Sequence, residues 1–336
     1  MSSCCGCIND CCQRRKRLLP ADSLELITRR QPPCFSSLIV AGEVPGVWRS
    51  PSRLAQKQLV IDKHQHVSEN RRVLRRFWQI RKGACNRMRY AIISDIHANL
   101  EAFQVALEDI DRQDVQKVVC LGDIVGYYAN PNECAELCRS RGFLCLRGNH
   151  DDAVVGICGI EDFNPVAQEA LLWTERHLSD NNKAWLTQLP EQALVDDLFL
   201  AVHGSPSHPY DYIFSPASAS FAFDVLVSQH PRLAVCFFGH THQRALYSYD
   251  RKTTRELLEQ NQPLEFSLQD DRLYLINPGS IGQARDGKPG ASYLIYDGDG
   301  NTVTFRHVPY DFNLTRHKVT RAGLPVMLGE RLGLGL

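Results

Sequence analysis

Five short polar motifs carry side chains that together can bind metal ions. Each motif directly follows an apolar stretch of the kind that forms a buried strand. Carboxylate, imidazole and amide groups suit divalent cations of intermediate hardness, such as Mn, Fe, Co, Ni or Zn. The set contains no cysteine, which argues against a structural thiolate zinc site. The motifs are Asp95-Ile96-His97, Gly122-Asp123, Gly148-Asn149-His150-Asp151, His203-Gly204 and Gly239-His240-Thr241-His242.

Two of these motifs can present a pair of ligands on one side of the chain. Residues i and i+2 of an extended segment point to the same side, so Asp95 and His97 can hold one ion together, as can His240 and His242. Each motif alone is a weak signal, because a buried histidine is more often a satisfied core residue than a ligand. Five motifs in order, each at the end of a predicted strand, make coincidence a poor explanation.

The apolar stretches also predict the elements that position the motifs. Helical periodicity is expected at 99–112 and 130–141, and a third helix is expected to begin at Asn164-Pro165 and to continue through Leu186. The sequence Asp297-Gly298-Asp299-Gly300 indicates a hairpin. Strands are expected at 89–94, 117–121, 143–146, 198–202, 233–238, 245–249, 272–276, 292–296 and 302–308.

This order of elements predicts an α/β (α+β) fold. A βαβαβ unit comes first and a β-rich half follows, which fits two facing sheets in a sandwich flanked by helices. Ligands of open α/β sheets bind at the carboxyl ends of the strands. Five separate strands would therefore deliver the polar motifs to one edge.

Charge and cysteine content divide the chain near residue 88. Residues 1–87 hold 17 of the 38 Lys and Arg residues but only 6 of the 38 Asp and Glu residues, and they hold seven of the 13 cysteines. They show no strand or helix period, so we expect a basic Cys/Arg-rich extension that is disordered. Alternatively Met88 is the true start, because a strand and the first motif follow it at once. A zinc knuckle or lipid anchor in CCGCINDCC is less favoured, since its paired cysteines crowd the ligands.

Several classes of protein are disfavoured by composition. No window is apolar enough to predict a membrane span, and the first residues lack the apolar core of a secretory signal. Cysteines within apolar runs such as VVCLG and AVCFFG favour buried free thiols in a reducing compartment, so we expect a cytoplasmic protein. The acidic balance of residues 88–336 opposes general nucleic-acid affinity.

The five motifs in this order resemble those of the calcineurin-like metallophosphoesterases. The chain is most similar to a small prokaryotic branch that carries an Asn-Pro-Gly-Ser turn, here Asn277-Pro278-Gly279-Ser280. The resemblance covers about residues 88–330, and residues 322–332 look like the last helix of the family. It implies one metallophosphoesterase domain, 88–336, with the family's four-layer fold.

The resemblance also implies two divalent metal ions, with Mn expected first and Fe, Zn, Co or Ni as alternatives. Asp123 would bridge the two ions. The remaining ligands would be Asp95, His97 and His242 for the first ion, and Asn149, His203 and His240 for the second.

Three catalytic roles follow from the same resemblance. His150 would protonate the leaving group or stabilise the transition state. Asp151 would orient His150 through its other ring nitrogen. Arg147 would contact the phosphate, and Arg285 is a weaker candidate for that role.

These assignments predict hydrolysis of phosphate mono- or diesters by a water that two metals activate. A phosphorylated small molecule or a nucleotide is the expected partner. Activity on dinucleoside polyphosphates or phosphoproteins remains open, and four loop tyrosines can stack on a base or be ordinary loop aromatics. A non-catalytic scaffold is disfavoured because every ligand position is kept. The tyrosines are Tyr127, Tyr128, Tyr210 and Tyr212.

Overall fold

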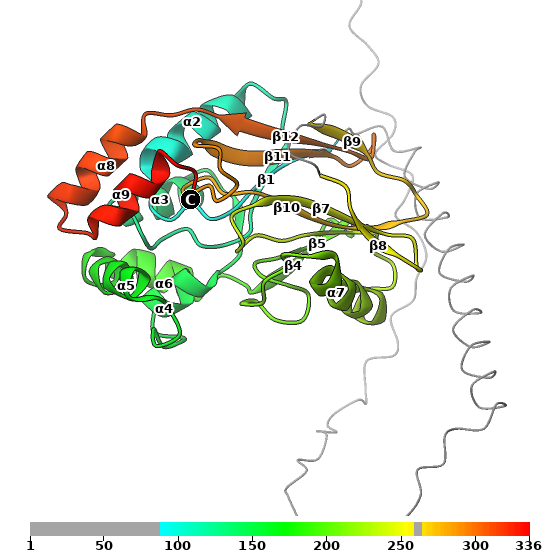
Figure 1. Ribbon diagram of the computed structural model, residues 1–336, viewed down its shortest axis with the longest axis horizontal. Coiled ribbons are helices and arrows are strands. Elements are labelled where there is room, and N and C mark those ends of the chain that lie inside the picture. The colour runs from blue at the N-terminus through cyan, green and yellow to red at the C-terminus, as the bar shows by residue number, and fades with distance from the viewer. Residues whose placement is uncertain (1–87, 259–263) are drawn as a thin grey trace, which may run out of the picture. The chain divides into compact units, whose positions relative to one another are not determined.

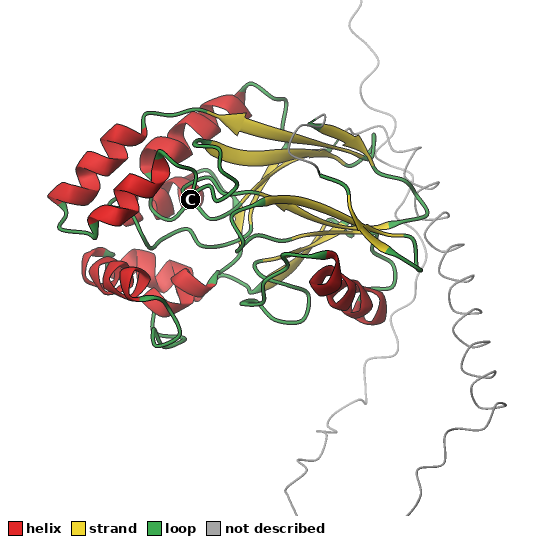
Figure 2. Ribbon diagram, in the orientation of Figure 1, coloured by secondary structure: helices red, strands yellow, loops and turns green. Residues whose placement is uncertain are grey.

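Two six-stranded sheets packed face to face form the centre of the structure (Figure 1). The computed structural model describes residues 88–258 and 264–336. The predictions made for residues 1–87 lie outside this part of the chain. Figure 2 shows the strands of the two sheets in yellow with helices around them.

The first sheet has a parallel half and an antiparallel half. Its strands are β1 (Arg89–Ile93), β2 (Lys117–Cys120), β3 (Leu144–Cys145), β9 (Glu265–Ser267), β11 (Ala291–Asp297) and β12 (Thr302–Val308). They lie in the order β3-β2-β1-β11-β12-β9. The first three are parallel, and β11 joins them antiparallel to β1. The parallel half therefore sends the ends of β1, β2 and β3 to the same edge.

The second sheet has a parallel centre between antiparallel edges. Its strands are β4 (Gln192–Val195), β5 (Phe199–Val202), β6 (Val235–Phe237), β7 (Arg244–Tyr249), β8 (Thr254–Glu256) and β10 (Leu273–Pro278). They lie in the order β4-β5-β6-β10-β7-β8. Strands β5, β6 and β10 run parallel, so β5 and β6 end at one edge as well.

The main core fills the space between the sheets, and strand alternation explains which residues enter it. Tyr90 and Ile92 of β1 belong to this core, whereas Ala91 and Ile93 belong to the core on the opposite face of the sheet. Tyr90 meets Phe199 of the facing sheet edge-on, with ring centroids 5.1 Å apart. Strand β1 is thus buried on both faces, as its uninterrupted apolar sequence predicts.

Helices cover the outer faces and complete four layers. Helices α2 (Leu100–Asp111) and α3 (Pro131–Ser140) pack on the first sheet, and α7 (Pro216–Gln229) packs on the second. Phe103 of α2 and Phe223 of α7 are fully buried against their sheets. The predicted sandwich of two facing sheets flanked by helices is confirmed.

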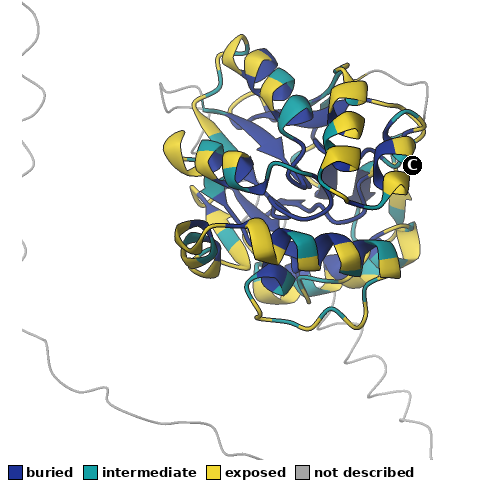
Figure 3. Ribbon diagram, turned by 90° about the vertical axis from the view of Figure 1, so that its left-hand side faces the viewer, coloured by how far each residue is buried: buried dark blue, intermediate teal, exposed yellow. Residues whose placement is uncertain are grey.

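The remaining helices gather at one end of the sheets. In the view of Figure 3 their outward faces are exposed and the strands behind them are buried. No helix in the described residues is long and apolar enough to cross a membrane. These helices are α4 (Asn149–Val154), α5 (Pro165–His177), α6 (Asp180–Thr187), α8 (Phe312–Arg321) and α9 (Val326–Leu332).

One predicted helix is two helices in the structure. The helix expected from residue 164 through Leu186 is interrupted at Leu178, whose backbone is extended. The hydroxyl of Ser179 then caps a new helix by accepting a hydrogen bond from the Asn182 N–H. The prediction of a single helix was therefore wrong, although both apolar faces were recognised.

Candidate metal centre and active site

All five polar motifs meet at the edge where their strands end. Strands β1, β2 and β3 lead to the first three motifs, while β5 and β6 of the facing sheet lead to the last two. The side chains form two overlapping groups in which the ligand atoms lie within 4.8 Å of one another. All are buried, and Asp123 belongs to both groups. The groups are Asp95, His97, Asp123 and His242, and Asp123, His203 and His240.

Three imidazole rings are oriented by backbone carbonyl groups. The Nδ1 atoms of His97, His203 and His242 lie 3.3, 2.9 and 2.7 Å from the carbonyl oxygens of Val125, Leu121 and Gln283. Each Nδ1–H can donate to its carbonyl, which leaves the lone pair of each Nε2 directed into the site. Histidines that bind metals usually donate their other ring N–H to a carbonyl or carboxylate group in this way.

The nitrogen and oxygen atoms that face into the site lie close together. The Nε2 atoms of His97 and His242 lie 3.0 Å apart. Oδ1 of Asp95 lies 3.3 Å from His242 Nε2 and is buried without a hydrogen-bond partner. On the other side, Nε2 of His203 lies 3.4 Å from Asp123 Oδ2 and 3.1 Å from Asn149 Oδ1. Divalent cations would satisfy these nitrogen and oxygen atoms, so the residues fit the implied metals.

The backbone at the candidate ligands adopts a costly conformation. Positive φ angles between 50° and 65° occur at non-glycine residues of this group. Such left-handed residues each cost on the order of 1–3 kcal/mol and persist only where the surrounding structure imposes them. The turns after the strands therefore aim these side chains at the site. The residues are Asp95, His97, Asp123, His240 and His242.

Burial and neighbouring carboxylates shift the pKa values of the candidate ligands strongly, some upward and some downward. Burial raises the pKa of Asp95 to about 7. Burial alone would lower the pKa of His203, but the carboxylate of Asp123 raises it to about 9. Burial lowers the pKa of His240 to about 3 and holds the pKa of His97 well below its usual value. A protein without cations would therefore retain protons on His203 and Asp95 near neutral pH.

His150 lines the cavity beside the metal ligands and is almost fully buried. Its ring lies between Tyr127 and Phe163, with centroids 4.5 and 5.1 Å away. Its Nδ1 has no hydrogen-bond partner and packs on Gly126, where a Cβ atom would lie 2.5 Å from it. Gly126 also has a φ of +95°, so both space and conformation require glycine there. Nε2 is thus the nitrogen left for a ligand.

Asp151 does not orient His150, and that prediction was wrong. Its carboxylate accepts hydrogen bonds from the backbone N–H groups of Ile124, Val125 and Gly148. It therefore fastens the turn that carries Asp123 to the turn that carries Asn149. These donors are backbone groups, which motif spacing does not reveal.

Arg147 lies outside the residues that line the cavity. Its guanidinium forms an ion pair with Asp152 and donates to the carbonyl oxygen of Leu189 at 2.7 Å. The predicted contact of Arg147 with phosphate does not match this placement. Arg285, the weaker candidate, does line the cavity together with Arg331 of α9, which the motif analysis missed.

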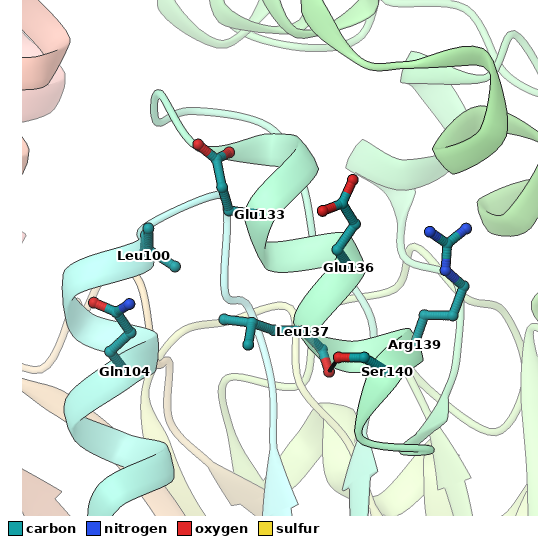
Figure 4. Close-up of a pocket in the computed structure, with 7 residues that line it drawn as sticks. All are labelled: Leu100, Gln104, Glu133, Glu136, Leu137, Arg139 and Ser140. Carbon is teal, nitrogen blue, oxygen red and sulfur yellow. Dashed lines mark hydrogen bonds between the residues drawn. The ribbon is translucent and has the colours of Figure 1, made fainter.

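The cavity over the candidate metal centre has a volume of about 610 Å³. Its walls combine the metal-ligand residues with aromatic rings and arginines. A separate surface pocket between α2 and α3 contains none of the predicted site residues, and Figure 4 shows Glu133, Glu136 and Arg139 around it. Of these two, the cavity over the candidate metal centre is the one that contains predicted site residues.

Comparison with known proteins supports the predicted family and fold. A model of the calcineurin-like phosphoesterase superfamily domain matches residues 88–301. An uncharacterized protein of Methanocaldococcus jannaschii is 38% identical over 251 residues, which are 73% of this chain and 97% of that protein.

Solved structures agree with this match. A metallophosphoesterase from Sphaerobacter thermophilus is 37% identical with a TM-score of 0.64, covering 75% of this chain and 100% of its own. A hypothetical protein from Pyrococcus horikoshii is 19% identical with a TM-score of 0.59, covering 73% of this chain and 97% of its own. The second similarity concerns the fold alone.

Proposed function

Because the chain belongs to the calcineurin-like phosphoesterase superfamily, we propose that it is a dinuclear metal-dependent hydrolase of phosphate mono- or diesters. The facing Nε2 atoms of His97 and His242, 3.0 Å apart, carry this proposal. Burial holds the pKa of both rings well below the usual value, so both are neutral near neutral pH. With each Nδ1–H donated to a backbone carbonyl, no proton lies between the two Nε2 atoms. A divalent cation held by His97 and His242 would offset the repulsion between these lone pairs.

The donor set supports two cations that share Asp123. Asp95, His97 and His242 complete the first site. The second site takes its other ligands from Asn149, His203 and His240. Manganese is the cation proposed first, and Fe, Zn, Co and Ni suit the same donors.

The chain's own groups complement the cations. When bound, two divalent cations supply Lewis acidity and an activated water for attack on phosphorus. His150 has a pKa that burial lowers to about 4, so its ring is neutral and can donate a hydrogen bond from Nε2. That bond stabilises the leaving oxygen or the phosphate. Arg285 adds a positive charge on the cavity wall.

A stacked row of rings favours substrates that carry an aromatic base. Tyr212 stacks on His240 with centroids 3.9 Å apart, and Phe214 stacks on Tyr212 at 5.1 Å. Tyr212 and Phe214 are both about half exposed, so a base can extend the row. Nucleotides, including dinucleoside polyphosphates, are therefore candidate substrates. Other phosphorylated small molecules and phosphoproteins are alternatives on the same site.

Free cysteines support a cytoplasmic location. In the described residues every cysteine is a free thiol, and all except Cys158 are buried. Burial raises the pKa of the Cys236 thiol, which keeps it protonated and unreactive. Such thiols are typical of proteins in reducing compartments.

Replacing the shared ligand tests the proposal. Asp123→Asn removes a charge from both metal sites, so we expect loss of bound metal and a fall in kcat/KM of about 10³-fold, or about 4 kcal/mol. Mass spectrometry of the metals and turnover of p-nitrophenyl phosphate measure the two effects. Asp111→Asn, at an exposed ion pair, is the control. Full activity of Asp123→Asn would contradict the mechanism.

A further inference from the structure

Two arginines on the cavity wall have no carboxylate partner among the described residues. Arg285 donates to Gln283 Oε1 from Nε and Nη2, at 3.1 and 2.8 Å, and to the hydroxyl of Tyr127 at 3.3 Å. The hydrogen bond of Arg331 also goes to Gln283 Oε1, at 3.4 Å. Nε of Arg331 is buried without a partner. Arg331, which lines the cavity, thus has only one long hydrogen bond for its guanidinium among the described residues.

The shared oxygen brings two like charges close together. Both guanidinium groups donate to Gln283 Oε1, which is a neutral acceptor. Two cations that share a neutral acceptor repel each other, and an anion bound beside them would offset this repulsion. Arginine forks bind carboxylates and phosphates through two parallel hydrogen bonds.

Gln283 fixes the arginines relative to the metal centre. Its backbone carbonyl accepts from Nδ1 of the candidate ligand His242, while its side-chain amide donates to the hydroxyl of Tyr128 at 3.0 Å. That hydroxyl donates to the carbonyl oxygen of Leu328 in α9. Gln283 itself is buried. One rigid residue thus links a metal ligand, both arginines and the last helix.

The titratable groups that share the cavity with Arg285 and Arg331 include candidate metal ligands. The backbone N–H of Arg285 donates to the carbonyl oxygen of the candidate ligand His242 at 3.2 Å, and both residues line the cavity. Glu161 and Asp162 also line the cavity, but they are exposed and form no ion pair with either arginine. The scissile phosphate would bind at the metal centre, which leaves Arg285 and Arg331 free to bind a second anion.

We propose that Arg285 and Arg331 form a second anion subsite in the same cavity. It selects phosphoesters whose alcohol portion carries another anionic group, either a phosphate or a carboxylate. This proposal rests on the proposed function, because the metal centre must hold the scissile phosphate. Arg331 is then a specificity-determining residue, contributed by the helix α9 that follows the family domain match.

Three aryl phosphates test the subsite on the full-length protein with Mn²⁺. Phenyl phosphate has no second anion, 4-carboxyphenyl phosphate adds a carboxylate, and 1,4-phenylene bisphosphate adds a phosphate. We expect Arg331→Met to lower kcat/KM about tenfold for the two doubly anionic esters, through KM, and less than twofold for phenyl phosphate. Comparing each ester between variant and wild type removes differences in leaving group. The ester with the larger loss identifies the preferred second anion.

Two further variants separate specificity from stability. Arg331→Lys should retain part of the preference because it keeps the charge, and Arg321→Met, at an exposed residue of α8, should change nothing. Equal losses on all three esters would assign Arg331 to the scissile phosphate or to the fold and overturn the subsite. An unchanged KM for every ester in Arg331→Met would also overturn it.

A binding measurement distinguishes failure of the subsite from failure of the proposed function. Calorimetry can compare phenylphosphonate with 1,4-phenylenebisphosphonate, neither of which is hydrolysed. Tighter binding of the bisphosphonate that is lost in Arg331→Met supports the subsite even if no ester is turned over. Equal binding of the two ligands by the wild-type protein contradicts it.

Discussion

The candidate ligands are held in a state that a protein without cations does not favour. Buried carboxylates, inward-facing imidazole lone pairs and left-handed backbone angles each cost free energy. They occur together among the candidate ligands, with the left-handed angles after β1, β2 and β6. Cations that fit the donors would offset these costs, which is why we assign the strain to function.

Substitution of His150 should separate catalysis from metal binding. The ring of His150 contacts the candidate ligand His97 edge-on, with centroids 4.6 Å apart, but its Nδ1 packs on Gly126 without a hydrogen bond, so His150→Gln should keep both metals. Loss of one hydrogen-bond donor should lower kcat by about 10²–10⁴-fold. The loss should be larger for phenyl phosphate than for p-nitrophenyl phosphate, since the poorer leaving group needs the donor more.

The control for this variant is His317→Gln, at an exposed residue of α8. Metal content and the two rates would be measured side by side. If His150→Gln lost metal in proportion to activity, the proposed role of His150 would be wrong.

Metal binding should release protons in a pH-dependent way. A cation must displace the proton of His203 below about pH 9 and also that of Asp95 below about pH 7. We therefore expect about one proton released at pH 8 and about two at pH 6, with affinity falling as the pH falls. Calorimetry in buffers of different ionisation enthalpy counts these protons. Affinity for Mn²⁺ that stays constant from pH 6 to pH 8 would contradict this account.

Among single residues, the sequence predicted the side chains at strand ends and missed contacts between other distant segments. Each predicted ligand follows the end of its own strand, so Asp95 and His97 meet His242 where the strands of the two sheets end at one edge. The contacts of Asp151 and the place of Arg331 depend on segments far apart in the chain. No local pattern specifies such contacts.

Among the helices and strands, those with a clear periodic pattern were predicted, and those with a weak or short pattern were missed. Strand β12 was predicted with its observed bounds, and β1 within one residue. Helix α7 was missed because its sequence PASASFAFDVLVSQ is apolar on most sides and has little helical period. The edge strands β8 and β9 have three residues each, too few to show alternation.

Asp109 of α2 joins its helix to the first sheet. Its carboxylate accepts from the hydroxyl of Tyr293 at 2.7 Å and from Arg306 at 2.8 Å. Burial alone would raise the pKa of Asp109, but these two donors lower it below its usual value. The stabilisation is therefore present above about pH 4 and is lost as the pH falls through the lowered pKa.

Asp109→Asn should destabilise the protein by about 1–3 kcal/mol at pH 7, because the charged acceptor of a buried hydrogen bond from Tyr293 and of a partly buried ion pair with Arg306 is lost. Urea unfolding with saturating metal measures this change. Asp111→Asn on the same helix has an exposed ion pair and should cost at most about 1 kcal/mol. Equal effects of the two substitutions would show that the contact of α2 with the sheet does not depend on Asp109.

For the described residues as a whole, the cavity joins parts that are distant in sequence. Ligands come from both sheets, His150 comes from α4, and Arg331 comes from the last helix. The order of elements was enough to predict two sheets with the site at one edge. It could not predict that α9 would contribute to the cavity wall, because that contact depends on Gln283 and Tyr128 in two separate loops.

Turnover with and without metal tests the central claim most directly. Initial rates of the full-length protein would be measured on p-nitrophenyl phosphate and bis-p-nitrophenyl phosphate, with Mn²⁺, after chelation, and after Mn²⁺ is restored. We predict hydrolysis of at least one ester that disappears on chelation and returns with the metal. Hydrolysis that persists in metal-free protein, or none from a folded protein with two bound ions, would contradict the account.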